Sequence, residues 1–456
     1  MGDCLHGEER TCISKYRRIV LKTLYIVHCV DTEGPMTESL ISTFERLFTI
    51  YGIKIEATEK NLLLLQNKQM ELGGIEESVS KTFSASNLKY NQSWVEIDDM
   101  LDRIMSKSFR NRTVDDFGNG WIYSWHCMDH IGYSSNPRMK DVGFGNIHRH
   151  YKQKIDKQEN CSDEINWHFH PLSFNKNPTQ TTTSYLNCMD ELLQILCHRI
   201  IDENYFPASY RPGFHAERPD SHTFLEQWIP FDYANQNYEN ENLEPDLIEG
   251  RIGDWRRSSS SWRGYHPSHD DYQIAGNCKR IIFRCLNIGT RHSLLGENHV
   301  RQAFVEAKLE GSAILSFTNH DYREMAEDID YVRNIIEKIR VEFPEVKIAF
   351  SGSHAAAISH NRHHDVAAPK INIQLSNNLL EIKLEEGELF GPQPFLAIKT
   401  KNGVYFNDNL IIVKPNTEWK YFFDQNSVFI DDVEVIGVAS AGRYGNSTVE
   451  KLNLPN

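Results

Sequence analysis

Short apolar runs alternate with amphipathic stretches over most of the chain. Residues 19–30 (IVLKTLYIVHCV) form a β-rich apolar run, the pattern expected of a strand buried on both faces. A further strand is expected to end near Arg211, within the segment 206–215. Other predicted strands cover residues 121–128, 165–169, 229–233, 280–286, 313–318 and 347–351.

Helical periodicity fills many of the segments between these runs. In residues 36–51, Leu40, Phe44, Leu47 and Phe48 mark one apolar face. Other predicted helices cover residues 189–201, 220–228, 299–309 and 322–343, and a basic helix contains residues 148–151. The alternation of strands with helices predicts an α/β layer or a (β/α) barrel.

The chain has 456 residues, more than one hydrophobic core normally supports, so two domains are expected. A barrel domain would cover residues 1–365 and carry a polar helical insertion near 57–115. Residues 366–456 instead show short β-prone runs separated by turn signals, which predicts a small β-sheet or sandwich. The sandwich has no convincing catalytic cluster, so a structural cap is favoured over a carbohydrate-binding module.

Composition narrows the possible partners and compartment. A formal net charge of -14 disfavours nucleic acid, because phosphate binding needs clustered Lys and Arg. No stretch has the length of apolar residues that crosses a bilayer, and the N-terminus lacks the features of a signal peptide. The nine cysteines form no Cys-x-x-Cys pair, which favours free thiols in a reducing cytoplasm. The oligomeric state stays open.

Two pairs of polar residues follow predicted strands. Asp31 and Glu33 are two residues apart at the end of the first strand, and His168 and His170 have the same spacing at the end of the strand predicted at 165–169. Residues two apart on a strand project to the same face, so each pair can reach one cleft. Two imidazoles and a carboxylate can bind one divalent ion. The alternative for the acidic pair is that Asp31 or Thr37 caps the helix at 36–51.

Other candidates also lie at predicted strand ends. Because the carboxyl ends of parallel strands meet at one edge of a sheet or barrel, these side chains are expected in one site. The further candidates are Asp129, His130, Arg211, Asp232, His320 and Asp321. The long loop at 238–271 adds Trp255, Trp262 and Tyr265, which would either stack on sugar rings or attach the loop to the body.

In this order, the motifs resemble those of polysaccharide deacetylases of the NodB-homology type (carbohydrate esterase family four), and more narrowly the WbmS-type branch associated with O-antigen gene clusters. The resemblance spans roughly residues 20–355. The acidic motif is D-x-E here, where the family has an adjacent pair, and the histidines are separated by one residue where the family usually has three. The arginine motif matches Tyr210-Arg211-Pro212-Gly213-Phe214.

The resemblance implies a distorted (β/α) barrel that removes an N-acyl group from a carbohydrate in surface-polysaccharide biosynthesis. A divalent ion, most simply Zn²⁺ with Co²⁺ or Fe²⁺ as alternatives, would polarise the acyl carbonyl. Its implied ligands are Glu33, His168 and His170, and the implied catalytic residues are Asp31 as base, Arg211 as its orienting partner, His320 as acid and Asp232 or Asp321 as the carboxylate that tunes His320.

Two other classes of function stay open at this point. One is a different metal-dependent amidohydrolase, although in that barrel family the His-x-His pair lies on the first strand. The other is a non-catalytic deacetylase-like protein that binds glycan or serves as a scaffold, because fold alone does not determine function.

Overall fold

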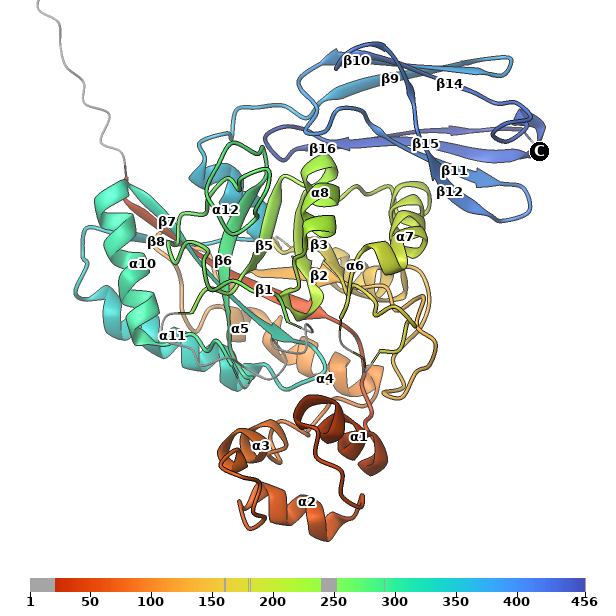
Figure 1. Ribbon diagram of the computed structural model, residues 1–456. Helices are drawn as coiled ribbons and strands as arrows, with labels where there is room; N and C mark the ends of the chain where they lie inside the picture. Colours follow the sequence, from red (N-terminus) through yellow and green to blue (C-terminus); the bar gives the residue numbers. More distant parts are fainter. Residues whose placement is uncertain are drawn as a thin grey trace, which may run out of the picture.

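The computed structural model describes residues 21–159, 161–178, 180, 182–238, 252–290 and 292–455. Its central feature is a closed parallel barrel of seven strands with helices between them (Figure 1), which confirms the prediction of a (β/α) barrel. Strands β1 to β7 are neighbours in chain order, and β7 pairs with β1 to close the ring. The barrel strands are β1 (Thr23–Thr32), β2 (Tyr123–Cys127), β3 (Glu164–Phe169), β4 (Ser209–Pro212), β5 (Phe231–Asn235), β6 (Ile281–Asn287) and β7 (Ser312–His320).

The barrel is distorted at β1, which has different neighbours at its two ends. Residues from His28 onward pair with β2, whereas residues 23–26 pair with β8 (Lys347–Phe350). Helix α12 (Ser353–His360) follows β8 directly. The Ser353 hydroxyl lies 2.8 Å from that of Ser124 and 2.7 Å from that of Ser209, so the start of α12 is tied to β2 and β4.

The predicted helices are present, with corrected starts. The helix expected at 36–51 begins at Leu40, because the Ser39 side chain accepts a hydrogen bond from Ser42 N and caps it. Neither Asp31 nor Thr37 is that cap. Besides α12, the α-helices that the structure describes in the barrel domain are α1 (Leu40–Tyr51), α2 (Glu59–Gln66), α3 (Glu76–Thr82), α4 (Trp94–Ile104), α5 (Lys107–Arg110), α6 (Asn146–Asp156), α7 (Met189–Ile201), α8 (Pro219–Trp228), α10 (Glu297–Glu310) and α11 (Ala326–Arg340).

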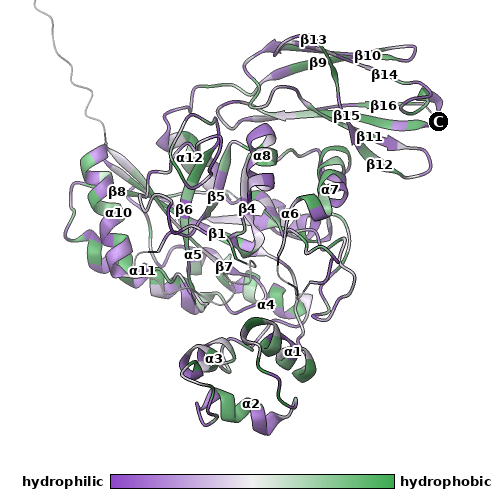
Figure 2. Ribbon diagram, viewed as in Figure 1, coloured by the Kyte–Doolittle hydropathy of each residue, from purple (hydrophilic) through white to green (hydrophobic). Residues whose placement is uncertain are grey.

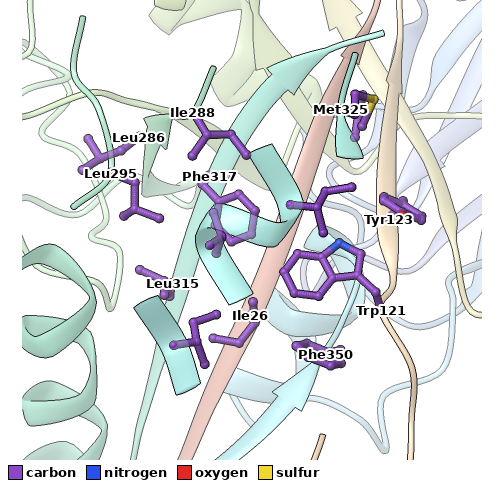
Figure 3. Packing of buried hydrophobic residues seen from close by; sticks show 14 of the residues in the cluster. Ile26, Trp121, Tyr123, Leu286, Ile288, Leu295, Leu315, Phe317, Met325 and Phe350 are labelled. Carbon is purple, nitrogen blue, oxygen red and sulfur yellow. The ribbon is translucent and has the colours of Figure 1, made fainter. Parts of the chain in front are cut away.

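The main core lies between the barrel and its helical layer. Figure 3 shows Ile26 of β1, Phe317 of β7 and Phe350 of β8 packed around Trp121. Hydrophobic and hydrophilic residues alternate along α10 and α11 in Figure 2, consistent with helices that cover the barrel with one face only. Burying these apolar side chains fixes the strands whose ends carry the polar residues.

The C-terminal residues form two four-stranded antiparallel sheets with a shared apolar core, as predicted for a sandwich. The strands that begin at residues 405, 418 and 447 were not predicted, because the first two are only four and five residues long and the third is mostly polar. The sheets consist of β9 (Lys370–Ser376), β10 (Leu379–Glu386), β13 (Ile411–Lys414) and β14 (Glu418–Phe422), and of β11 (Phe395–Thr400), β12 (Tyr405–Asp408), β15 (Val433–Ala441) and β16 (Ser447–Asn453). Helix α7 packs against the second sheet, and Figure 1 shows the sandwich on the side of the barrel away from α1–α3.

Candidate metal centre

A cavity of about 510 Å³ is lined by the carboxyl ends of the barrel strands, by the loops that follow them and by α1. Strand register brings the predicted residues into it. Asp31 of β1 lies opposite His320 of β7, and His168 of β3 lies opposite Arg211 of β4. Five of the six residues with the main predicted roles line the cavity, and the sixth, Arg211, contacts Asp31, because parallel neighbours end at the same level.

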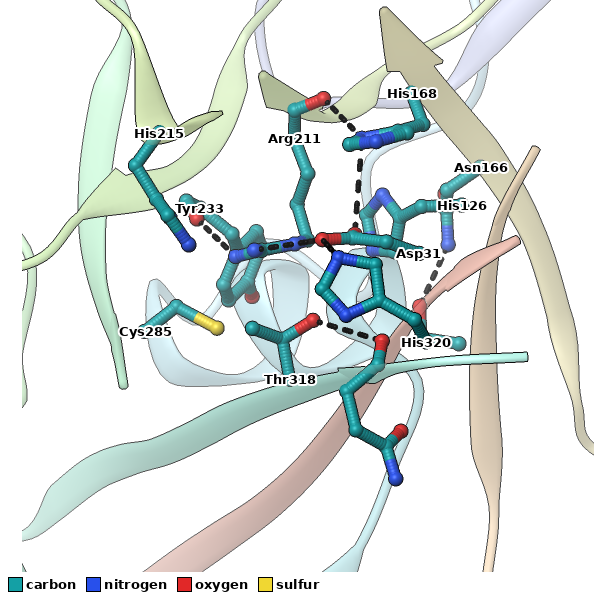
Figure 4. A network of polar contacts seen from close by, with 12 residues as sticks. Asp31, His126, Asn166, His168, Arg211, His215, Tyr233, Cys285, Thr318 and His320 are labelled. Atoms are coloured by element: carbon teal, nitrogen blue, oxygen red, sulfur yellow. Dashed lines mark hydrogen bonds and ion pairs between the residues drawn. The ribbon is translucent and has the colours of Figure 1, made fainter. Parts of the chain in front are cut away.

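Asp31 and Arg211 form the most buried ion pair of the site. Arg211 Nε donates to Asp31 Oδ1 at 2.7 Å and Nη2 to Oδ2 at 3.1 Å, while Nη1 donates to the Tyr233 carbonyl oxygen at 2.6 Å. Figure 4 shows this pair among the surrounding histidines. Burial by itself raises the pKa of Asp31, but the Arg211 guanidinium together with His168 and His320 outweighs it and holds the pKa far below its ordinary value. Asp31 is thus a fixed, ionised carboxylate.

Glu33, His168 and His170 form a group that could hold a metal ion, with one ligand atom of each within 4.8 Å of the others. His168 Nε2 and His170 Nε2 lie 3.0 Å apart, and His170 Nε2 lies 3.3 Å from Glu33 Oε1. His168 Nδ1 donates to the Arg211 carbonyl oxygen at 2.9 Å, which leaves the lone pair of Nε2 facing the group. Two imidazole nitrogens and a carboxylate suit a zinc-class ion, so these residues fit the expected cofactor.

Glu33 is held by backbone contacts on both of its sides. Asp321 accepts hydrogen bonds from Glu33 N at 2.8 Å and Gly34 N at 2.9 Å, and His130 Nε2 donates to the Glu33 carbonyl oxygen at 2.8 Å. Lys140 Nζ lies 3.0 Å from Glu33 Oε2. Burial would raise the pKa of Glu33, but Lys140 and His170 outweigh it and hold the pKa well below its ordinary value.

His170 is placed by the turn that follows β4. A Cβ atom on Gly213 would lie 2.3 Å from Cγ and Cδ2 of the His170 ring, so only glycine allows this approach. The next residue, Phe214, has a φ of 56° and its ring meets the His170 ring edge to face, with centroids 4.6 Å apart. The Arg-Pro-Gly-Phe motif therefore supports both the guanidinium and one imidazole.

His320 faces both carboxylates from the end of β7. Its Nε2 atom lies 4.0 Å from Asp31 Oδ2 and 3.8 Å from Glu33 Oε1. Its ring stacks on Tyr322, with centroids 4.8 Å apart. Burial lowers the pKa of His320 to about 4 despite the two carboxylates. The His320 ring is therefore neutral near pH 7 and would need to gain a proton before it could act as an acid.

Two of the predicted acids, Asp232 and Asp129, lie outside the site. Asp232 is the second residue of β5, so its side chain lies on the opposite face of the strand from that of the next residue, Tyr233. The carbonyl oxygen of Tyr233 accepts a hydrogen bond from Arg211. Asp232 forms a buried ion pair with Arg280, so the prediction that it ends a strand beside His320 is wrong. Asp321 does reach the site, but it bonds the backbone of Glu33 rather than the His320 ring. Asp129 is likewise removed from the cavity, because it pairs with buried Arg199 at 2.8 Å.

The aromatic residues of the long loop are not sugar-stacking surfaces. Trp255 is 3% exposed and donates to the His215 carbonyl oxygen at 2.8 Å, and Trp262 is 1% exposed beneath the Arg284 guanidinium. The Tyr265 hydroxyl donates to the Tyr272 carbonyl oxygen at 2.7 Å. Their prediction as substrate contacts is wrong, and the alternative that they attach the loop to the body holds. Residues 239–251 of this loop lie outside the described residues.

Several cavity residues had no predicted role. Lys140, His215, Tyr322 and Arg323 line the cavity beside the metal group. His215 could have been found from its place directly after the arginine motif. Lys140 lies in a loop without periodicity, and nothing in its neighbourhood along the chain indicates that it reaches Glu33.

Comparisons of the chain with models of known families, with curated proteins and with solved structures found no match. Among the described helices, none combines the length and the apolar character that a membrane span requires. The function is therefore inferred from the cavity and from the motif resemblance.

Proposed function

We propose that this protein is a metal-dependent hydrolase that removes an N-acyl group, such as acetyl, from a carbohydrate in surface-polysaccharide biosynthesis. One observation carries the proposal: the metal-capable group of Glu33, His168 and His170 shares a cavity with the Asp31–Arg211 pair and His320. Ligands, a fixed carboxylate and a proton-carrying imidazole are the parts that hydrolysis of an amide needs.

Glu33, His168 and His170 would hold the ion, a zinc-class metal with Co²⁺ or Fe²⁺ as alternatives. When bound, such an ion polarises an acyl carbonyl and makes water more acidic. The imidazole tautomers suit this role, because the Nδ1 proton of His168 is already used on the Arg211 carbonyl oxygen.

Asp31 would accept the proton of the attacking water, and Arg211 would keep its carboxylate in one orientation through two hydrogen bonds. His320 would deliver a proton to the leaving amine. Asp31 Oδ2 and His320 Nε2 are 4.0 Å apart, too far for a direct hydrogen bond, so the proton would pass from base to acid through the water or the leaving group between them. Asp321 would act indirectly by holding the backbone of Glu33.

The proposed setting is the cytoplasm, where an activated or lipid-linked sugar would be the substrate. The described cysteines are free thiols, a state that fits a reducing compartment. The carbohydrate itself is proposed from the motif resemblance, not from the aromatic loop.

The test is metal analysis of protein purified without a histidine tag, followed by assays of acetate release from N-acetylated sugars. About one zinc-class ion per chain and acetate release that chelation abolishes are expected. A metal-free protein that binds glycan without releasing acetate would instead support the scaffold alternative.

A further inference from the structure

The cavity carries positive charge although the protein as a whole is acidic. Four Lys and Arg side chains line it against three carboxylates (Asp31, Glu33 and Glu38), whereas the chain has a formal net charge of -14. The four are Arg46, Arg138, Lys140 and Arg323. Lysine and arginine gathered in a concave site of an acidic protein indicate selection for an anionic ligand rather than a general surface property.

Two of these cations are held by one buried carboxylate. Arg46 donates from Nε and Nη2 to Glu38 at 2.9 Å each, and Arg138 donates to Glu38 Oε1 at 3.1 and 3.2 Å. The Tyr90 hydroxyl also donates to Glu38 at 3.1 Å. Burial would raise the pKa of Glu38, but the two guanidinium groups lower it to about 2. One negative charge therefore fixes two positive ones in place.

Arg323 has no carboxylate within ion-pair distance among the described residues. Its Nη2 donates to the Asn87 carbonyl oxygen at 3.0 Å and its Nη1 to the Gly289 carbonyl oxygen at 3.4 Å, while its Nε atom is buried without a hydrogen-bond partner in the part of the chain that the structure describes. The guanidinium lies over the rings of Tyr90 and Tyr322, 5.6 and 5.3 Å from their centroids. An uncompensated guanidinium with an unused buried donor is costly unless a ligand completes it.

This cationic group adjoins the proposed catalytic residues. Arg323 follows His320 by three residues, and Arg323 N donates to the His320 carbonyl oxygen at 3.3 Å. The Tyr322 ring contacts His320 on one side and the Lys140 ammonium on another, 4.4 Å from its centroid. A substrate whose acyl group reached Glu33 and His168 would therefore extend past Tyr322 toward the arginines.

Resting on the proposed function, we propose that the substrate is an N-acylated sugar bearing an anionic group, a phosphoryl or a carboxylate, which Arg323 binds with help from Arg138. A guanidinium presents two parallel N–H donors that match the oxygens of either group. The anion supplies the acceptor that Arg323 Nε lacks. It is also attracted by Arg46 and Arg138, whose two positive charges exceed the single negative charge of Glu38. The acyl group then lies at the metal group.

The test compares neutral and anionic N-acetyl sugars with the metal-loaded, full-length protein. Binding of N-acetylglucosamine, its 1-phosphate, its uridine-diphosphate derivative and N-acetylgalactosaminuronic acid is measured by calorimetry, and acetate release is measured in parallel. At least one anionic sugar should bind about 10- to 100-fold more tightly than the neutral one, the value of one or two charge-assisted hydrogen bonds. Comparison of the three anionic sugars distinguishes a sugar phosphate, a nucleotide-linked sugar and a uronic acid.

Arg323→Gln should remove this preference while binding of the neutral sugar is unchanged, and Arg323→Lys should retain part of it. The matched control is Arg301→Gln, whose exposed side chain pairs with Glu342 and does not line the cavity. Equal binding of neutral and anionic sugars by the wild type, or equal loss for both in Arg323→Gln, would overturn the inference. If the preference is present but no sugar releases acetate, the anion site stands and the proposed hydrolysis fails.

Discussion

The Arg211 guanidinium binds both carboxylate oxygens of Asp31, through Nε at 2.7 Å and Nη2 at 3.1 Å. The arginine comes from β4 and the aspartate from β1, on different sides of the barrel interior. This contact orients the proposed base and keeps it ionised. A substitution that keeps the contact but removes the basic oxygen therefore tests the catalytic role of Asp31 by itself.

Asp31→Asn is predicted to retain metal and lose hydrolysis by about a hundredfold or more, the usual scale for a lost general base. The amide oxygen still accepts a bond from Arg211, but the basic oxygen is gone. A helix-capping role no longer competes, because Ser39 caps α1. Turnover and a metal titration on the same sample provide the check, and turnover like that of the wild type at full occupancy would contradict the proposed base.

Glu33→Ala is predicted to abolish both metal binding and turnover, in contrast to the aspartate two residues earlier. Glu33 Oε1 lies 3.3 Å from His170 Nε2 and is part of the metal-capable group. Metal content measured by mass spectrometry distinguishes the roles of Glu33 and Asp31, because only Glu33→Ala should lose the ion. A variant that keeps stoichiometric metal would show that Glu33 is not a ligand.

His168→Ala and His170→Ala are predicted to lose the ion while the fold persists, because these rings face a cavity more than the apolar core. In the wild type, the ion should stabilise the folded state by about 3 kcal/mol when it is present at a hundred times its dissociation constant. Thermal unfolding with and without chelator measures this difference. Each variant should show no response to the chelator, and a retained response would assign the histidines a structural role.

These predictions also show how far the sequence alone leads. Asp31, Glu33, His168, His170, Arg211 and His320 could be placed in one site because each follows an apolar strand, and parallel strands end together. Asp232 could not be placed, because its partner Arg280 is distant along the chain and side-chain alternation turns it away from the interior. Trp255 was misjudged for a similar reason, since only the folded loop shows its indole buried against His215.

Gly213→Ala is predicted to weaken metal binding by about 10- to 100-fold, the usual cost of disturbing the support of a ligand. The added Cβ would lie 2.3 Å from the His170 ring, so the imidazole must shift. Gly296→Ala is the matched control, because its nearest neighbour would be 3.8 Å away and its φ is -136°. Competition with a chromogenic chelator gives both affinities, and equal values would show that the turn does not position His170.

The last prediction concerns acid stability and uses a histidine outside the site. His28 Nδ1 accepts a hydrogen bond from Trp121 Nε1 at 3.1 Å, and its Nε2 lies 2.9 Å from Asn319 Oδ1. The ring is therefore neutral, and burial lowers its pKa to about 4 from an ordinary value of 6.5.

Because the unfolded chain binds this proton more readily, the stability that neutral His28 contributes is complete above pH 6.5 and declines as the pH falls toward 4. Between pH 7 and pH 5 the loss should be about 2 kcal/mol. His28→Gln, although less stable throughout, should show a decline smaller by that amount in urea titrations at the two pH values. An unchanged difference would show that other buried groups dominate the acid response, and that His28 can be protonated without disturbing the contact between β1 and β7.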